Sequence, residues 1–159
     1  MSVAVEPLTG NLGWLLSQAS YVLTTQLAAA LEEVGLTPRS YCLLSKAMTG
    51  EYTQIELAHA IGLDKTTMVV TLDELEAAGL AERRRSSTDR RARVVAVTPA
   101  GKRKVAKGEQ IVERTQAEVL ATLASHERQA FMDALAQLVC GRLSTPAECA
   151  HTVRRRAGR

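Results

Sequence analysis

Six arginines lie within eleven residues in the middle of the chain: Arg83, Arg84, Arg85, Arg90, Arg91 and Arg93. Only one acidic residue, Asp89, stands among them. A run of charge is usually no more than a solvated face. A block this dense and this poor in acids instead indicates a localised site for a polyanion, such as the phosphate backbone of a nucleic acid.

The formal net charge of +3 hides a strong segregation of charge along the chain. Residues 1–82 contain 3 basic and 10 acidic residues, a net charge of −7. Residues 83–107 contain 10 basic residues and 1 acidic residue, a net charge of +9, and residues 108–159 add only +1. The acidic part should repel a polyanion everywhere except where the basic block is presented.

Most of the chain is predicted to form helices that would position this block. Apolar residues at three- and four-residue spacing predict a helix over residues 11–34. Three shorter helices, each behind a capping signal, are predicted over residues 38–48, 54–61 and 65–78. The signals are Thr37 before a proline, the capping box Thr53-Gln-Ile-Glu56, and Asp64.

After Gly79 the periodicity changes from helical to extended. Residues 80–85 and 92–97 flank a polar loop, which predicts two antiparallel strands. Two helices are then expected over residues 99–123 and 125–140, the second capped by Ser125. With one Phe, one Trp and three Tyr, the core must consist of Leu, Val and Ala, so the predicted fold is mainly α with a small β-hairpin.

The helices over residues 54–61 and 65–78 have the pattern of a helix-turn-helix. Ala58 allows a close helix crossing, Gly62 makes the turn, and Met68 packs the second helix onto the first. The arginine-rich hairpin follows directly, which makes the unit a winged helix-turn-helix. Its second helix can enter the major groove of DNA while the hairpin reaches the backbone and the minor groove.

Residues 36–101 carry a set of motifs in this order: Leu36-Thr-Pro38, Tyr52-Thr-Gln-Ile-Glu-Leu-Ala58, Leu75-Glu-Ala-Ala-Gly-Leu80, Asp89-Arg-Arg-Ala-Arg93 and Val97-Thr-Pro-Ala-Gly101. In these residues the chain resembles the MarR family of bacterial winged helix-turn-helix transcription regulators. The most specific part is Asp-Arg-Arg in the hairpin followed by Thr-x-x-Gly.

The resemblance implies a homodimer that binds a pseudo-palindromic operator in double-stranded DNA and acts as a ligand-responsive repressor. The implied organisation is an N-terminal dimerisation helix, a winged DNA-binding lobe, C-terminal dimerisation helices and a basic tail, over residues 1–35, 36–98, 99–143 and 144–159. The lengths of the N- and C-terminal helices agree with a homodimer, because their apolar stripes are too long for one small lobe to bury.

The expected DNA contacts come from three places. The helix over residues 65–78 presents Lys65, Thr66, Thr67, Val69 and Val70, with no arginine at its middle to pair with guanine, which predicts an A/T-leaning site. Thr53 and Gln54 are expected to bind phosphate through backbone N–H groups. In the hairpin the expected residues are Arg84, Asp89, Arg90, Arg91 and Arg93; the resemblance implies that Asp89 braces the loop, Arg91 enters the minor groove, and Arg90 holds the loop or a phosphate.

The resemblance also implies a small phenolic or otherwise anionic effector, bound between the dimerisation helices and the lobe. Trp14, Tyr21 and Tyr41 are the candidate pocket residues, with core or interface packing as the alternative for each. A redox-sensing regulator is a further alternative, through Cys42, although a lone cysteine among apolar residues is more often inert. A winged-helix module that binds proteins instead of DNA is another.

Several other classes are not indicated. The sequence has no glycine-rich phosphate loop, no nucleophile elbow and no His-x-x-x-His pair, so an enzyme is not expected. No cofactor is predicted, and Cys140, Cys149 and His151 lack the spacing of a zinc site. No apolar run reaches the roughly 18 residues of a membrane span, and the N-terminus does not resemble a signal peptide, so a cytoplasmic protein is expected.

Overall fold

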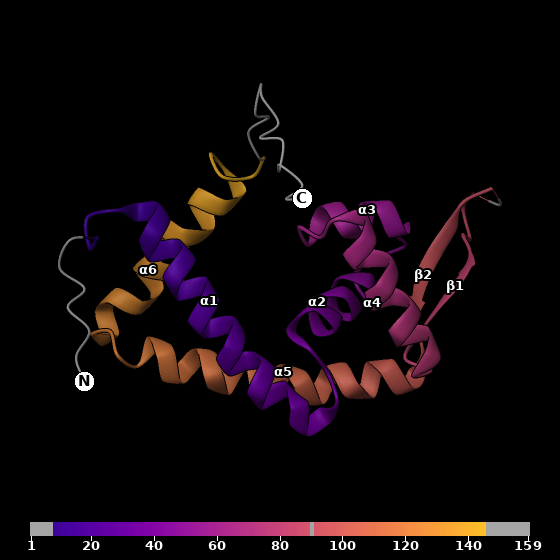
Figure 1. Cartoon of the computed structure of the whole chain (residues 1–159), viewed down its shortest axis with the longest axis horizontal. Helices are drawn as coiled ribbons and strands as arrows, with labels where there is room; N and C mark the ends of the chain where they lie inside the picture. Colours follow the sequence, from indigo (N-terminus) through magenta and orange to yellow (C-terminus); the bar gives the residue numbers. More distant parts are fainter. Residues whose placement is uncertain (1–7, 90, 146–159) are drawn as a thin grey trace, which may run out of the picture. The chain divides into compact units, whose positions relative to one another are not determined.

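The computed structural model describes residues 8–89 and 91–145, and Figure 1 shows the elements of this part of the chain. Their bounds, in chain order, are α1 (Leu12–Leu31), the short 3-10 helix η1 (Glu32–Val34), α2 (Pro38–Ala47), α3 (Gln54–Ala60), α4 (Lys65–Ala77), β1 (Ala81–Arg85), β2 (Arg93–Val97), α5 (Pro99–Leu120) and α6 (Ser125–Cys140). The order of helices and strands is the predicted one.

Local capping interactions define where helices α1 to α4 begin. The side chain of Asn11 accepts a hydrogen bond from the Trp14 N–H at the start of α1. Reciprocal capping boxes start α2 at Thr37 and α3 at Thr53, and Asp64 caps α4. These interactions confirm the predicted starts of α2, α3 and α4.

The core of the lobe is aliphatic, as the shortage of aromatic residues predicts. Its fully buried large side chains come from the end of α1 and from α2, α3 and α4, and they are Leu31, Leu43, Leu44, Leu57, Met68 and Leu72. Val105 and Ile111 of α5 join the same cluster. At Gly108 a Cβ would lie 3.0 Å from the Tyr41 ring and 3.3 Å from Leu31, so glycine allows α5 to approach this core closely.

A Schellman motif separates α4 from the hairpin. Gly79 has a φ of +68°, its N–H donates to the Glu76 carbonyl, and the Leu80 N–H donates to the Leu75 carbonyl. Strands β1 and β2 then pair antiparallel, from Ala81 opposite Val97 to Arg85 opposite Arg93. The hairpin projects from the side of the lobe formed by α2, α3 and α4 (Figure 1).

The chain divides into two compact units, one up to Gln116 and one from Ala117 onward. In the second unit, α6 spans Ser125–Cys140, and its cap lies one residue before the predicted one. Ala124 occupies the cap position and Ser125 is the first helical residue, so the predicted Ser125 cap is wrong. Instead, the Glu127 carboxylate accepts a hydrogen bond from the Ala124 N–H at 3.2 Å. No residue of α6 is buried.

The predicted boundaries at 1–35, 36–98 and 99–143 depend on dimerisation, which a single chain does not test, so they stay predictions. The predicted tail over residues 144–159 lies almost wholly outside the described residues. None of the helices in the described ranges combines the length and apolar character that crossing a membrane requires.

Candidate nucleic-acid interface

The helices α3 and α4 form a helix-turn-helix whose turn is set by the backbone. Gly62 has a φ of +69°, a left-handed conformation that favours glycine. The Leu63 N–H donates to the Ala58 carbonyl at 2.9 Å. Met68 is fully buried and Ala58 packs at the edge of the same cluster. The structure therefore confirms the positions predicted for these residues.

The outward side of α4 is short of charge. Lys65 and Thr66 are exposed, and Val70 keeps 51% of its surface exposed, while Val69 is half-buried. Thr67 differs, because its hydroxyl and its N–H both donate to the Asp64 carboxylate. Its hydroxyl is thus already bound within the helix cap. The same hydrogen bonds, the one from the Thr67 side chain first, lower the pKa of Asp64.

The hairpin is attached to the segment that precedes α3. The Val95 N–H donates to the Tyr52 carbonyl at 2.9 Å, and an isolated bridge joins Thr53 to Val94. Val94 and Val95 are buried. This attachment places the start of α3 beside Val94 and Val95 of β2.

Arg83, one of the six arginines of the block, is paired with acidic residues that lie outside the block. Its guanidinium forms ion pairs with Glu76 and, at 2.7 Å, with Asp73, both on α4. It also donates to the Gln54 side chain, and its backbone N–H donates to Glu76 at 2.7 Å. Only 24% of the side chain is exposed. Arg83 therefore holds β1, α3 and α4 together instead of facing a ligand.

Glu51 is a site residue that sequence reasoning missed. Its carboxylate accepts hydrogen bonds from the Ser86 hydroxyl at 2.8 Å and the Ser87 N–H at 3.1 Å, and it pairs with Arg84 at 3.5 Å. The hydrogen bonds from Ser86 and Ser87 lower the pKa of Glu51. In the sequence, the only indication of this role is that an acidic residue lies two positions before the capping box without a basic residue next to it.

At the far end of the hairpin the backbone folds around Asp89. Its carboxylate accepts the Arg91 N–H at 2.9 Å, and its carbonyl accepts the Ala92 N–H at 3.0 Å. This geometry agrees with the bracing role expected for Asp89. Arg91 is exposed, whereas Arg90, which was also predicted to act here, lies outside the described residues.

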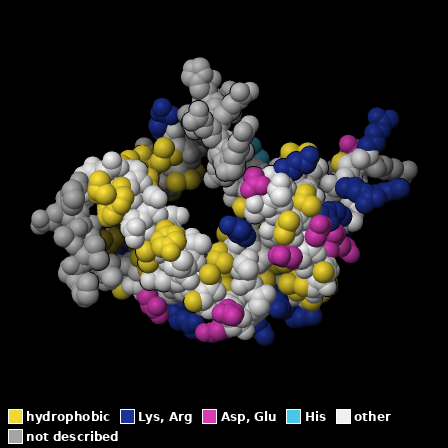
Figure 2. All heavy atoms as spheres, viewed as in Figure 1, with side chains coloured by type: hydrophobic (Ala, Val, Ile, Leu, Met, Phe, Trp, Pro, Cys, Tyr) yellow, Lys and Arg dark blue, Asp and Glu magenta, His cyan; other side chains and the backbone are white. Residues whose placement is uncertain are grey.

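Basic side chains gather on the hairpin, as Figure 2 shows at its right edge. Arg84, Arg85 and Arg93 are exposed, and Arg85 lies directly opposite Arg93 in the strand register. Like charges opposite each other on neighbouring strands are unfavourable unless an anion lies between them or nearby. The exposed arginines of the hairpin thus provide a site suited to phosphate groups.

The start of α3 differs from expectation. The Thr53 N–H was predicted to bind phosphate, but it donates to the Glu56 carboxylate at 2.7 Å within the capping box. The side-chain oxygen of Gln54 is engaged by Arg83. The Thr53 N–H is therefore not free, and of the two predicted backbone donors the Gln54 N–H remains a candidate.

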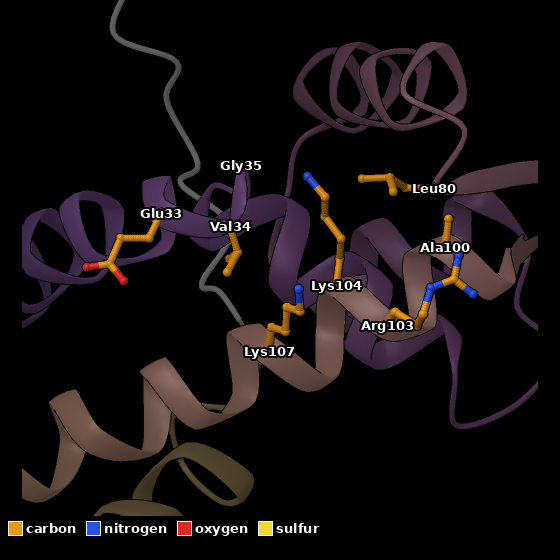
Figure 3. A pocket seen from close by; sticks show the side chains of 8 residues that line it. All are labelled: Glu33, Val34, Gly35, Leu80, Ala100, Arg103, Lys104 and Lys107. Atoms are coloured by element: carbon orange, nitrogen blue, oxygen red, sulfur yellow. The ribbon is translucent and has the colours of Figure 1, made fainter.

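The three aromatic candidates for an effector pocket differ in their exposure. Tyr21 is 69% exposed, and Trp14 and Tyr41 are half-buried. Tyr41 packs against Gly108, and desolvation raises the pKa of its hydroxyl. Two clefts in the described residues, one lined by Gly35 and Lys104 (Figure 3) and the other by Gly50 and Arg84, do not include any of the three. Tyr41 therefore has a packing role, while an effector pocket lined by the three residues stays a prediction.

Cys42 does not have the environment of a reactive thiolate. Desolvation raises the pKa of its thiol, which keeps it protonated. In the described ranges no three His, Cys, Asp or Glu side chains cluster as metal ligands would; Cys149 and His151 fall outside those ranges.

Comparisons with known proteins agree with this fold. A family model described as the MarR family matches residues 34–92. The chain is similar to CouR from Rhodococcus jostii RHA1 bound to p-coumaroyl-CoA, with 27% identity and a TM-score of 0.76, over 90% of this chain and 99% of that one. A MarR-family transcriptional regulator from Rhodococcus sp. RHA1 is also 27% identical, with a TM-score of 0.76, over 84% and 95% of the two chains.

CouR bound to a 23-mer DNA duplex is 26% identical to the chain and gives a TM-score of 0.77, over 87% of this chain and 99% of that one. The helix-turn-helix, the hairpin that follows it and the matched segment thus point to the same group of transcription regulators, and not to a family of enzymes. Over residues 34–92 the chain matches the MarR family.

Proposed function

We propose that this protein is a transcription regulator that binds double-stranded DNA as a homodimer and represses transcription until a small organic anion releases it. The observation that carries the proposal is the set of exposed arginines on a hairpin held beside the open face of α4. In this proposal α4 enters the major groove and Arg91 enters the adjacent minor groove.

The relatives support both halves of the proposal. CouR has been solved with a DNA duplex and with p-coumaroyl-CoA, which is an organic anion. A regulator with two such binding partners acts where the DNA is, so we place this protein in the bacterial cytoplasm.

The outward residues of α4 support an A/T-leaning half-site. Val69 and Val70 can contact thymine methyl groups, while Lys65 and Thr66 can reach the edge of the site. If sequence selection found the main information in G/C pairs under α4, this part of the proposal would be wrong.

The test is to retain random DNA fragments on the purified protein, sequence them and measure affinity for the enriched sequence. Arg91→Ala should weaken DNA binding by roughly 1–3 kcal/mol, about 5- to 150-fold, without changing the oligomeric state of the protein. The matched control is Arg114→Ala, which removes an exposed arginine from α5 and should leave affinity unchanged.

Salt provides an independent measurement. If a dimer neutralises about 6–10 phosphates, affinity should fall by roughly 10³ to 10⁵ between 50 and 200 mM salt. Binding that is insensitive to salt, or an Arg91→Ala variant that binds as the parent does, would point to a protein-interaction module instead.

A further inference from the structure

We propose that Ser87, in the loop between β1 and β2, is phosphorylated by a protein kinase that recognises arginine, and that the phosphate withdraws the hairpin from DNA. The effect on DNA rests on the proposed function, whereas the modification itself is measured without DNA. The hairpin would thus be under covalent control, independently of a small ligand.

Three hydroxyl groups follow one another in this loop, and the structure distinguishes Ser87 from its neighbours. Ser86 is half-buried, and its hydroxyl donates to the Glu51 carboxylate at 2.8 Å. The Thr88 hydroxyl is hydrogen-bonded to the Ser86 oxygen at 3.1 Å. Ser87 is exposed, and its backbone N–H donates to Glu51 at 3.1 Å. The backbone of Ser87 is therefore held in place while the residue stays at the surface, where an enzyme can reach it.

The residues before Ser87 supply the recognition element. Arg84 and Arg85 stand three and two positions before it, and both are exposed. They end strand β1, so the backbone that leads to the acceptor is already extended. In the part of the chain that the structure describes, β1 is an edge strand that pairs with β2 alone. Kinases select substrates by their charge pattern, and guanidinium groups pair well with carboxylates. A kinase with an acidic substrate groove therefore fits this segment.

The reaction transfers one phosphoryl group from a nucleoside triphosphate to the Ser87 side chain. The Ser87 oxygen forms a bond to the terminal phosphorus, and the bond from that phosphorus to the departing nucleoside diphosphate breaks. The proton of the hydroxyl passes to a base of the kinase. The product is a phosphoserine that carries a charge of about −1.5 to −2 at pH 7.

The added charge is large compared with the charge that the hairpin offers to DNA. The exposed arginines of the hairpin, in the ranges that the structure describes, are Arg84, Arg85, Arg91 and Arg93. A charge near −2 offsets about half of them. A phosphate on Ser87 also pairs with neighbouring guanidinium groups, which are then lost to the phosphates of DNA. The phosphate itself repels the DNA backbone.

The phosphate also acts on the contact that attaches the loop to the lobe. Glu51 accepts hydrogen bonds from Ser86 and Ser87 and pairs with Arg84 at 3.5 Å. A phosphate on Ser87 places a second anion beside the Glu51 carboxylate and competes with it for Arg84. The loop should therefore detach from the segment before α3, in addition to losing positive charge.

The first experiment tests whether the folded protein presents Ser87 to a kinase. The probe is the catalytic subunit of cyclic-AMP-dependent protein kinase, which selects arginines two and three positions before a serine, and mass spectrometry locates the phosphate. Ser87 should be phosphorylated, and the double variant Arg84→Ala and Arg85→Ala should react about tenfold more slowly or less. Arg114→Ala, which removes an exposed arginine from α5, should react as the parent does. Phosphate on Ser86 or Thr88 alone, or on unfolded protein alone, would overturn the assignment of Ser87.

The second experiment examines the protein as its own cells make it. Phosphate should be found on Ser87 in a fraction of the chains isolated from growing or stationary cells, and a phosphatase should remove it. Protein without phosphate at Ser87 in both samples would contradict the proposal.

The third experiment measures the consequence on protein made with phosphoserine at Ser87 through an expanded genetic code. Affinity for the enriched DNA sequence should fall by about tenfold or more, and exchange of the Ser87 amide should accelerate. Phosphoserine at Ser144, an exposed residue outside the hairpin, adds the same charge and should leave both unchanged. Equal losses of DNA affinity would mean that net charge alone is responsible, and the proposed switch would fail. A protein that carries phosphate on Ser87 but binds no DNA in either form would overturn only the proposed function.

Discussion

Glu51 attaches the end of β1 to the segment before α3 through one carboxylate. Because that carboxylate accepts hydrogen bonds from Ser86 and Ser87, Glu51→Ala should release this part of the hairpin while leaving the buried core intact. We expect amide exchange at Ser87 to accelerate severalfold and DNA affinity to fall, in hydrogen-exchange and binding measurements. Glu82→Ala, which removes an exposed carboxylate from β1, is the matched control and should change neither.

The same carboxylate predicts a pH dependence. The hydrogen bond from the Ser86 hydroxyl, followed by those from Ser87, lowers the folded pKa of Glu51. Its contribution is therefore complete above the unfolded pKa of about 4.3 and is lost as the pH falls through the lower folded value. Protection of the Ser87 amide should be constant around neutrality and decline only in acid. Glu51→Gln should remove that decline, and an unchanged decline would show that another group is responsible.

At the scale of elements, Arg83 connects β1 to α4 and α3. Arg83→Met should lower the free energy of unfolding by about 1–3 kcal/mol, because it leaves the half-buried Glu76 carboxylate without its partner. Urea denaturation measures this loss. Arg85→Met, two residues further along the same face of β1, removes an exposed arginine and should stay within about 0.5 kcal/mol. Equal effects of the two substitutions would mean that the ion pairs do not stabilise the lobe.

The start of α5 lies close to the turn after α4. A Cβ at Gly101 would lie 2.1 Å from the Leu80 carbonyl oxygen, although alanine is otherwise favoured over glycine in a helix by about 1 kcal/mol. Gly101→Ala should therefore lower the melting temperature. Gly13→Ala in α1, where the nearest atom is the Asn11 side chain at 3.4 Å, should leave it unchanged or raise it. A Gly101→Ala protein that melts higher would show that α5 and the turn can separate.

These elements also show how far the sequence could predict the structure. The Thr53–Glu56 capping box, the Asp64 cap and the turns at Gly62 and Gly79 depend on residues within five positions of each other, and all were predictable. The partners of Arg83 and Glu51 were not, because Gln54 lies 29 residues from Arg83 and Ser86 lies 35 residues from Glu51. Such pairs form only when the hairpin packs on the lobe, which residue spacing does not reveal.

At the scale of the molecule, some side chains of the acidic segment form ion pairs with side chains of the basic segment. Asp73, Glu76 and Glu51 of the acidic segment hold Arg83 and Arg84 of the basic segment. The charge that the hairpin offers to DNA is consequently smaller than the +9 of its sequence block. The other cations of that block that the structure describes lie on the hairpin and on the first half of α5.

The second unit has an exposed apolar stripe on α6. In α6 no residue is buried, and Phe131 and Leu138, seven positions apart on one side of the helix, are 49% and 37% exposed. An apolar stripe of this kind needs a partner, which in the proposed function is a second copy. The melting temperature should therefore rise with protein concentration.

Leu138→Asp should shift the protein toward monomer in sedimentation equilibrium, because it places a charge in that stripe. Ala136→Asp introduces the same charge at an exposed position on the opposite side of α6 and should leave the mass unchanged. The Leu138→Asp protein should also lose affinity for a two-half-site operator more than for a single half-site, since a monomer contacts only one. A monomeric parent protein, or equal behaviour of the two variants, would exclude α6 as the dimer interface.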